Sequence, residues 1–168
     1  MALDKISSFN KVIHKYNVLV YGGVMFTGGG VSVYSQCEPG WRPYQGRCYY
    51  FSVEPKSWNQ AHASCLTLGG DLMSIQTYQE REFVSGILAT GDVWTGLHDP
   101  LQVGFYTWSD GHMTSFTHWE PGQPNNHDGF REDCVEISAN GTLSWWNDLN
   151  CDQNYRHCNQ KMFYCKIN

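Results

Sequence analysis

Apolar residues follow a helical spacing in the stretch after Pro55. Trp58, Ala61 and Cys65 fall three or four positions apart, so a helix would place them on one face. Ser57 precedes them and belongs to a residue type that favours the N-cap position. The pair Gly69-Gly70 would end the helix. These signals predict a first helix that starts after Ser57.

A second helical pattern follows from Thr77 to Leu88. Thr77 and Glu80 have the spacing of a capping box, in which each side chain bonds to the other residue's backbone. An apolar stripe follows, formed by Phe83, Val84, Ile87 and Leu88. We therefore expect a second amphipathic helix here.

The remaining pattern is that of short strands and turns. Pro and Gly turn signals flanked by aromatic residues predict a hairpin between Cys37 and Cys48. Further strands, some with adjoining turns, are predicted at 93–97, 105–112, 134–137 and 162–166, with loop over most of 115–130. Two helices, then short strands and a long loop, indicate an α+β domain.

The N-terminus has a different composition. A basic region holds Lys5, Lys11, His14 and Lys15. No charged residue follows from Val18 to Ser35, and small residues stand at Val33 and Ser35, which favours a secretory leader, residues 1–35, before a domain at 36–168. Five glycines dilute the apolar stretch, so a type II membrane anchor is the weaker alternative, with an N-terminal extension as a third.

Composition narrows the function classes. The net charge is −5 and no basic cluster is present, which argues against nucleic acid as a partner. The seven cysteines include no C-x-x-C pair and the histidines are scattered, which argues against structural zinc. Widely spaced cysteines favour disulfides in an oxidising compartment.

Oxygen-bearing side chains gather in two segments. One is Q-P-N-N-H-D-G-F-R-E-D-C, residues 123–134, and the other is W-W-N-D, residues 145–148. Both read as loop and turn. Carboxylates and amides in such a set provide the oxygen ligands that Ca²⁺ prefers, about six to eight of them.

The motifs and their order resemble the C-type lectin family from Cys37 to Cys165. They are W-N-Q-A-H-A-S-C, L-G-G-D-L, V-W-T-G-L-H-D, F-Y-T-W-S-D-G, F-T-H-W, G-Q-P-N-N, E-D-C-V-E-I and W-W-N-D-L-N-C. The resemblance implies the C-type lectin fold, with two helices packed on small antiparallel sheets and a long calcium-binding loop region. The tryptophans at 58, 94, 108 and 119 and the phenylalanines at 105 and 116 are then expected to support core and loops.

The resemblance also implies a calcium site that binds sugar. The residues at its ligand positions are Gln123, Asn125, Glu132, Asn147 and Asp148. Two adjacent sugar hydroxyls would complete the coordination of the ion, and Pro124 would follow a cis peptide bond. His127 stands where galactose-type members often carry a tryptophan, so it either stacks on the sugar or is a plain exposed loop residue.

A second calcium position of the family is less well matched. Asp99, Asn126 and Asp133 fall near its ligand positions, but Val103 stands where an acidic ligand is expected. We therefore do not expect this second site to be complete.

The triplet Gln123-Pro124-Asn125 is a hybrid of two family patterns. Members with E-P-N resemble mannose binders, and members with Q-P-D resemble galactose binders. With Asn147 the site offers three amide donors, and Glu132 is its one obvious acceptor. Two carboxylates in the cage rather than three predict weaker calcium binding. We lean to mannose-, fucose- or glucosamine-type sugars, bound through Asn125.

The resemblance implies three disulfides: Cys37–Cys48, Cys65–Cys165 and Cys134 with Cys151. Pairing of Cys134 with Cys158 stays open, as does an arrangement in which Cys158 replaces Cys165 as the closing cysteine. A leftover thiol would permit a disulfide-linked dimer, and multivalent lectins gain affinity from non-covalent assembly too.

Taken together, the sequence predicts a secreted, calcium-dependent module that binds glycans on microbes or cells. The alternative is a member of the same fold that binds a protein or an ice surface without sugar. An enzyme is not indicated, because no nucleophile lies at a suitable spacing from a base.

Overall fold

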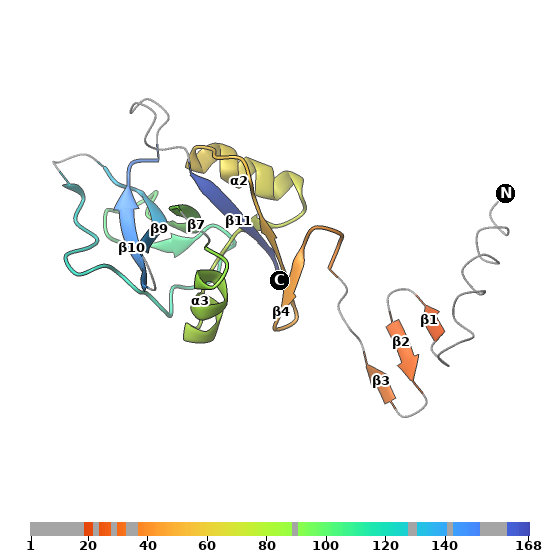
Figure 1. Ribbon diagram of the computed structural model, residues 1–168. Helices are drawn as coiled ribbons and strands as arrows, with labels where there is room; N and C mark the ends of the chain where they lie inside the picture. The colour runs from red at the N-terminus through yellow and green to blue at the C-terminus, as the bar shows by residue number, and fades with distance from the viewer. Residues whose placement is uncertain are drawn as a thin grey trace. The chain divides into compact units, whose positions relative to one another are not determined.

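The N-terminal part of the chain forms a compact unit of its own. The computed structural model describes residues 19–21, 24–27, 30–32, 37–88, 91–127, 131–140, 143–151 and 161–168. The chain divides into two units, Met1–Pro39 and Gly40–Asn168. The first contains an antiparallel sheet of β1 (Leu19–Tyr21), β2 (Val24–Thr27) and β3 (Gly30–Ser32) (Figure 1). The expected leader end at Ser35 lies outside the described residues.

In the part of the chain that the structure describes, no helix is long and apolar enough to cross a bilayer.

The second unit is built on a mixed sheet. Its strand order is β10-β9-β7-β11-β5-β4, with β6 paired to β11 and β8 paired to β7. The bounds are β4 Arg42–Tyr44, β5 Arg47–Phe51, β6 Asp71–Leu72, β7 Val93–His98, β8 Thr107–Trp108, β9 Cys134–Asn140, β10 Leu143–Leu149 and β11 Met162–Ile167. The expectation of antiparallel sheets needs one amendment, because β7 and β11 pair in parallel. The expected α+β class is confirmed.

The first predicted helix is α2, Trp58–Thr67. Ser57 caps it, and Ser57 and Gln60 form a reciprocal capping box that satisfies backbone groups at the helix start. Trp58, Ala61 and Cys65 are buried, as their spacing predicts. After the helix, Gly69 adopts a φ of +82°, which favours glycine.

The second predicted helix is α3, Tyr78–Ser85, which is shorter than expected. Thr77 accepts from the Glu80 backbone N–H, but the Glu80 side chain does not complete a capping box. Instead Glu80 is fully buried and binds Lys166 of β11 at 2.6 Å. The predicted apolar stripe is wrong in part, because the helix ends at Ser85 and Ile87 and Leu88 lie beyond it.

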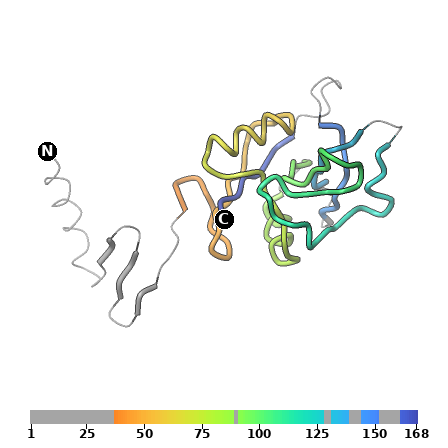
Figure 2. The backbone as a smooth tube through the Cα atoms, turned by 180° about the vertical axis from the view of Figure 1, so that it is seen from behind, coloured from red at the N-terminus to blue at the C-terminus, as the bar shows by residue number. Residues whose placement is uncertain are grey.

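Aromatic residues contribute many of the large side chains in the core. Trp58, Trp94 and Trp108 are buried, and Phe116 and Trp119 pack against the core. Phe105 is 66% exposed, so its expected supporting role is wrong. Figure 2 shows the long path of residues 109–127, in green to teal, which contains no named helix or strand. This path is the expected long loop.

Candidate functional site

The long loop is fastened to strand β10 by backbone hydrogen bonds. Trp146 N–H donates to the His118 carbonyl, and Glu120 N–H donates to the Trp146 carbonyl, both at 3.0 Å. Farther along, Gln123 N–H donates to the Glu120 carbonyl at 2.8 Å. These bonds bring the Gln123-Pro124-Asn125 triplet beside strand β10, where the Asp148 side chain bonds to the loop.

The triplet itself has two notable features. The Gln123–Pro124 peptide bond is cis, as the resemblance implies. The side-chain oxygen Oε1 of Gln123 is buried and accepts no hydrogen bond within the described residues. A buried oxygen without a donor is costly, and a cation would satisfy it.

Asp148 holds the loop after the triplet. Its side chain is fully buried, and it accepts from the backbone N–H of Asn125 at 3.0 Å and of Asn126 at 2.9 Å. The Tyr106 hydroxyl donates to the same carboxylate at 3.4 Å. No lysine, arginine or histidine of the described part pairs with it, so a buried anion stands without a counter-ion.

The expected location of Asn147 and Asp148 in a loop is wrong. Both lie on strand β10, in register with Glu136 and Val135 of β9. The flanking tryptophans explain this, because Trp146 is fully buried and anchors the strand in the core. A strand holds the two side chains more rigidly than a loop would.

Glu132 is bonded to the same loop at two points. Its Oε2 accepts from the His127 N–H at 2.8 Å, and its own N–H donates to Asn126 Oδ1 at 3.2 Å. Asn126 adopts a φ of +44°, a left-handed conformation that asparagine tolerates. His127 and Asn125 are exposed, at the outer side of this loop.

Asn147 is linked to Glu136 rather than to the loop. Its Nδ2 donates to Glu136 Oε1 at 3.1 Å across the β9–β10 pair. The sequence reading missed Glu136. A hairpin turn centred on Asn140-Gly141 would place Trp145 opposite Glu136, so the turn signal did not indicate this contact. The observed register pairs Asn140 with Leu143, and four residues farther along each strand Glu136 faces Asn147.

The donor set fits calcium. Glu132 and Asp148 supply carboxylates and Gln123, Asn125 and Asn147 supply amides, all of which are oxygen ligands that calcium accepts. Within the described ranges no group of three or more His, Cys, Asp and Glu is placed to hold a metal. A cation at this site would therefore depend on the three amide oxygens as well as on the two carboxylates.

The residues near the second calcium position of the family have separate contacts. Asp99 is fully buried; its Oδ2 accepts from the Gly104 N–H at 2.7 Å, and its Oδ1 has no partner in the described part. Asp133 is paired with Arg131 at 3.0 Å. Val103 is 57% exposed and offers no ligand.

Burial raises the pKa of two groups beside the site, the Asp99 carboxyl and the Tyr106 hydroxyl. It raises the pKa of Asp99; the hydrogen bond from Gly104 opposes the change, and the Asp133 carboxylate adds to it. Burial also raises the pKa of Tyr106, and the nearby Asp148 carboxylate acts in the same direction. The Tyr106 hydroxyl therefore stays protonated and donates to Asp148, a contact that the sequence reading missed.

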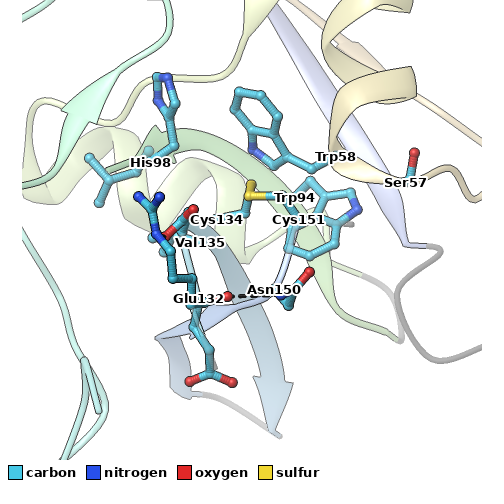
Figure 3. Close-up of a disulfide and its surroundings, with 12 residues drawn as sticks. Ser57, Trp58, Trp94, His98, Glu132, Cys134, Val135, Asn150 and Cys151 are labelled. Carbon is cyan, nitrogen blue, oxygen red and sulfur yellow. Dashed lines mark hydrogen bonds and ion pairs between the residues drawn. A yellow bond between two sulfur atoms is a disulfide. The ribbon is translucent and has the colours of Figure 1, made fainter. Parts of the chain in front are cut away.

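A disulfide fixes the base of the loop. Cys134 and Cys151 are bonded, with their Cα atoms 5.3 Å apart, close to the rings of Trp58 and Trp94 (Figure 3). Next to it, Asn150 Nδ2 donates to the Arg131 carbonyl at 2.9 Å. The start of β9 and the end of β10 are thereby joined.

The other cysteines follow the pairing that the resemblance implies. Cys65 of α2 is bonded to Cys165 of β11, which excludes the arrangement with Cys165 as a tail thiol. Cys37 and Cys48 are each disulfide-bonded. Cys158 lies outside the described residues.

Comparison with known proteins identifies the family. The model of the lectin C-type domain matches residues 54–159. The chain belongs to the C-type lectin family, whose domain is a non-enzymatic binding domain. C-type mannose receptor 2 of Homo sapiens is 45% identical over 121 residues, which cover 70% of this chain and 8% of the receptor. The chain thus spans less than a tenth of that relative's length.

Solved structures agree with this assignment. The C-type carbohydrate-recognition domain of cow CD23, solved in the presence of a GlcNAc2Man3 oligosaccharide, matches with a TM-score of 0.70 and 30% identity, over 79% of this chain and 95% of that one. A calcium-independent type II antifreeze protein matches with a TM-score of 0.69 and 27% identity, over 79% and 94%. The fold therefore occurs both in a carbohydrate-recognition domain and in an antifreeze protein.

Proposed function

We propose that this protein binds carbohydrate through a calcium ion held by Gln123, Asn125, Glu132, Asn147 and Asp148. The observation that carries the proposal is the fully buried Asp148 carboxylate, which has no cationic partner among the described residues. The unpaired Gln123 Oε1 supports the same conclusion. The likeness to a mannose receptor and to a carbohydrate-recognition domain supports a sugar as the ligand.

The proposal assigns roles to Asp148, Glu132, Asn125 and Asn147. When bound, the ion supplies coordination positions that the vicinal hydroxyls of a sugar can fill. Asp148 holds the backbone of the triplet loop, and Glu132 holds the loop at His127. The amide groups of Asn125 and Asn147 donate to sugar oxygens or give oxygen to the ion, and Glu132 accepts from a sugar hydroxyl.

The hybrid triplet bears on specificity. With amides at both Gln123 and Asn125, the site has more donors than one hydroxyl pair can satisfy, at a cost of about 1–3 kcal/mol for a dry unpaired group. We infer weak binding with a preference for mannose-, fucose- or glucosamine-type sugars. His127 is exposed at the rim, where a modest contact with the sugar is compatible with its location.

We further propose an extracellular location for the domain, residues 36–168, after a leader or extension at 1–35. Its disulfides support an oxidising compartment. Secretion is favoured, with membrane anchoring as the alternative. The partners would be glycans on cells or microbes, and linkage through Cys158 or non-covalent assembly would raise the avidity.

A second candidate function is binding of a protein or an ice surface. It is favoured by the likeness to a calcium-independent type II antifreeze protein and by the hybrid triplet. In that case the loop would serve as a shaped surface and calcium would be dispensable.

A glycan array separates the two functions. The protein is probed in millimolar calcium and again in EDTA, beside the variant Asp148→Asn. Binding to mannose-, fucose- or glucosamine-type glycans that is lost in EDTA and in the variant is the expected result. Binding that persists in EDTA, or no glycan binding together with thermal hysteresis of ice growth, overturns the calcium-dependent proposal.

A further inference from the structure

The neighbourhood of Asn147 contains a carboxylate outside the proposed calcium cage. Glu136 and Asn147 face each other across β9 and β10, and Asn147 Nδ2 donates to Glu136 Oε1 at 3.1 Å. We propose that Glu136 is a positioning residue, which orients the Asn147 amide so that its oxygen is presented to the ion. This inference rests on the proposed function.

The physical reason lies in the two ends of an amide. A carboxamide carries an oxygen acceptor at one end and an NH₂ donor at the other, and the two are nearly equal in size. An ionised carboxylate only accepts hydrogen bonds, so Glu136 selects the NH₂ end of Asn147. Oδ1 of Asn147 is then directed away from Glu136, and an NH₂ group is kept away from the cation.

Glu136 is itself fixed in place. Its side chain is almost fully buried and forms an ion pair with the ammonium of Lys161. Lys161 also binds Asp92 at 3.1 Å and lies 5.7 Å from the centre of the Trp94 ring. Asp92 accepts in turn from the Ser138 hydroxyl at 3.0 Å. This chain of contacts leaves the carboxylate of Glu136 little freedom to turn.

A simpler interpretation is that the Glu136–Lys161 ion pair serves only the stability of the sheet. The two interpretations differ for Glu136→Gln, which keeps the shape but can donate as well as accept. The new amide can bind Asn147 Oδ1, which allows the Asn147 group to turn and present NH₂ to the ion. A purely structural role predicts lower stability and no effect on the orientation of Asn147.

The first readout requires no metal. In the calcium-free protein, the side-chain amide of Asn147 is assigned by NMR from the signal lost in Asn147→Asp. We expect a downfield, slowly exchanging proton, as for a donor to a carboxylate, and an upfield shift with faster exchange in Glu136→Gln. An Asn147 signal that is the same in the two proteins overturns the inference. Because this readout is independent of calcium, it still decides the inference if the calcium site fails.

The second readout is calcium affinity by calorimetry. Loss of a group that orients a metal ligand reduces metal affinity by about 10–100-fold, so we expect Glu136→Gln to weaken binding by at least about tenfold. Glu80→Gln is the matched control, because it makes the same change in another buried lysine ion pair, that with Lys166, which is not bonded to Asn147 or Glu136 in the described part of the chain. Its calcium affinity should stay within about twofold of wild type.

Rescue completes the test. A carboxylate at position 147 has oxygen at both ends, so its orientation no longer matters. We therefore measure the effect of Asn147→Asp on calcium affinity in two backgrounds. We expect it to raise the affinity by a larger factor in the Glu136→Gln protein than in wild type. Equal factors in the two backgrounds, or an unchanged affinity in Glu136→Gln, overturn the inference.

Discussion

Asp148 accepts hydrogen bonds from the backbone N–H groups of Asn125 and Asn126, at 3.0 and 2.9 Å. A buried residue of strand β10 thus determines the path of a loop more than twenty positions earlier in the chain. The bonds are charge-assisted, and such bonds are stronger than those between neutral groups. The loop that carries the triplet is therefore held in place by the same carboxylate that would bind the ion.

Replacement of Asp148 tests both proposed roles of its carboxylate, holding the loop backbone and binding calcium. Asp148→Asn substitutes an NH₂ group for one accepting oxygen, so one backbone donor loses its partner and the cage loses a charge. We expect calcium binding to fall below detection in calorimetry and the calcium-free protein to lose about 1–3 kcal/mol of unfolding free energy. Glu120→Gln changes an exposed carboxylate of the same loop and should leave both quantities unchanged. Wild-type calcium affinity in Asp148→Asn would contradict the proposed site.

A change at Gln123 should act in the opposite direction. Gln123→Glu adds a third carboxylate to the cage and replaces a donor by an acceptor. Since calcium affinity rises with ligand charge, we expect calcium to bind roughly tenfold more tightly, with mannose binding strengthened as well. Calorimetry measures both. Gln79→Glu, which adds the same charge at an exposed position of α3, is the control, and no change in Gln123→Glu would refute the charge argument.

His127 contributes to the loop through its backbone. The N–H of His127 donates to Glu132 at 2.8 Å, and an alanine would keep that bond. We expect His127→Ala to leave calcium affinity unchanged and to alter glycan affinity by no more than about twofold. A tenfold loss of glycan affinity with normal calcium binding would instead assign a stacking role to the imidazole.

The buried ion pair of Glu80 and Lys166 predicts a pH dependence of stability. Burial alone would raise the pKa of Glu80, but hydrogen bonds from the Gln76 backbone and the Lys166 ammonium lower it below its usual 4.5. The stabilisation by ionised Glu80 is therefore present above the unfolded pKa and is lost as the pH falls through the folded one.

Glu80→Gln removes this contribution. We expect it to lower the unfolding free energy at about pH 7 by about 3–5 kcal/mol, because it removes the carboxylate that balances the buried charge of Lys166. The variant should also lose less stability than wild type between about pH 5 and about pH 3. Urea unfolding across this range measures both effects. Glu54→Gln, at an exposed position, is the control, and parallel pH profiles for wild type and Glu80→Gln would disprove the assignment.

Local signals predicted much of the fold. The cap at Ser57 and the spacing of Trp58, Ala61 and Cys65 predicted α2, since these features depend on neighbours within one helical turn. The second helix is shorter than its predicted stripe because it ends at Ser85, with Gly86 as its C-cap. Its buried face is also partly polar: Glu80 and Arg81 are buried beside Val84. Their burial depends on partners such as Lys166, which lies 86 positions away by residue number.

For the candidate site, the sequence by itself determined the kinds of atoms available: amide and carboxylate oxygens in two segments, and the cysteines that bracket them. The tertiary structure decided how those atoms are held. It placed Asn147 and Asp148 on a strand, left Asp148 buried without a counter-ion in the described part of the chain, and set Glu136 opposite Asn147. Strand register and burial arise from contacts between distant segments, so composition and spacing do not specify them.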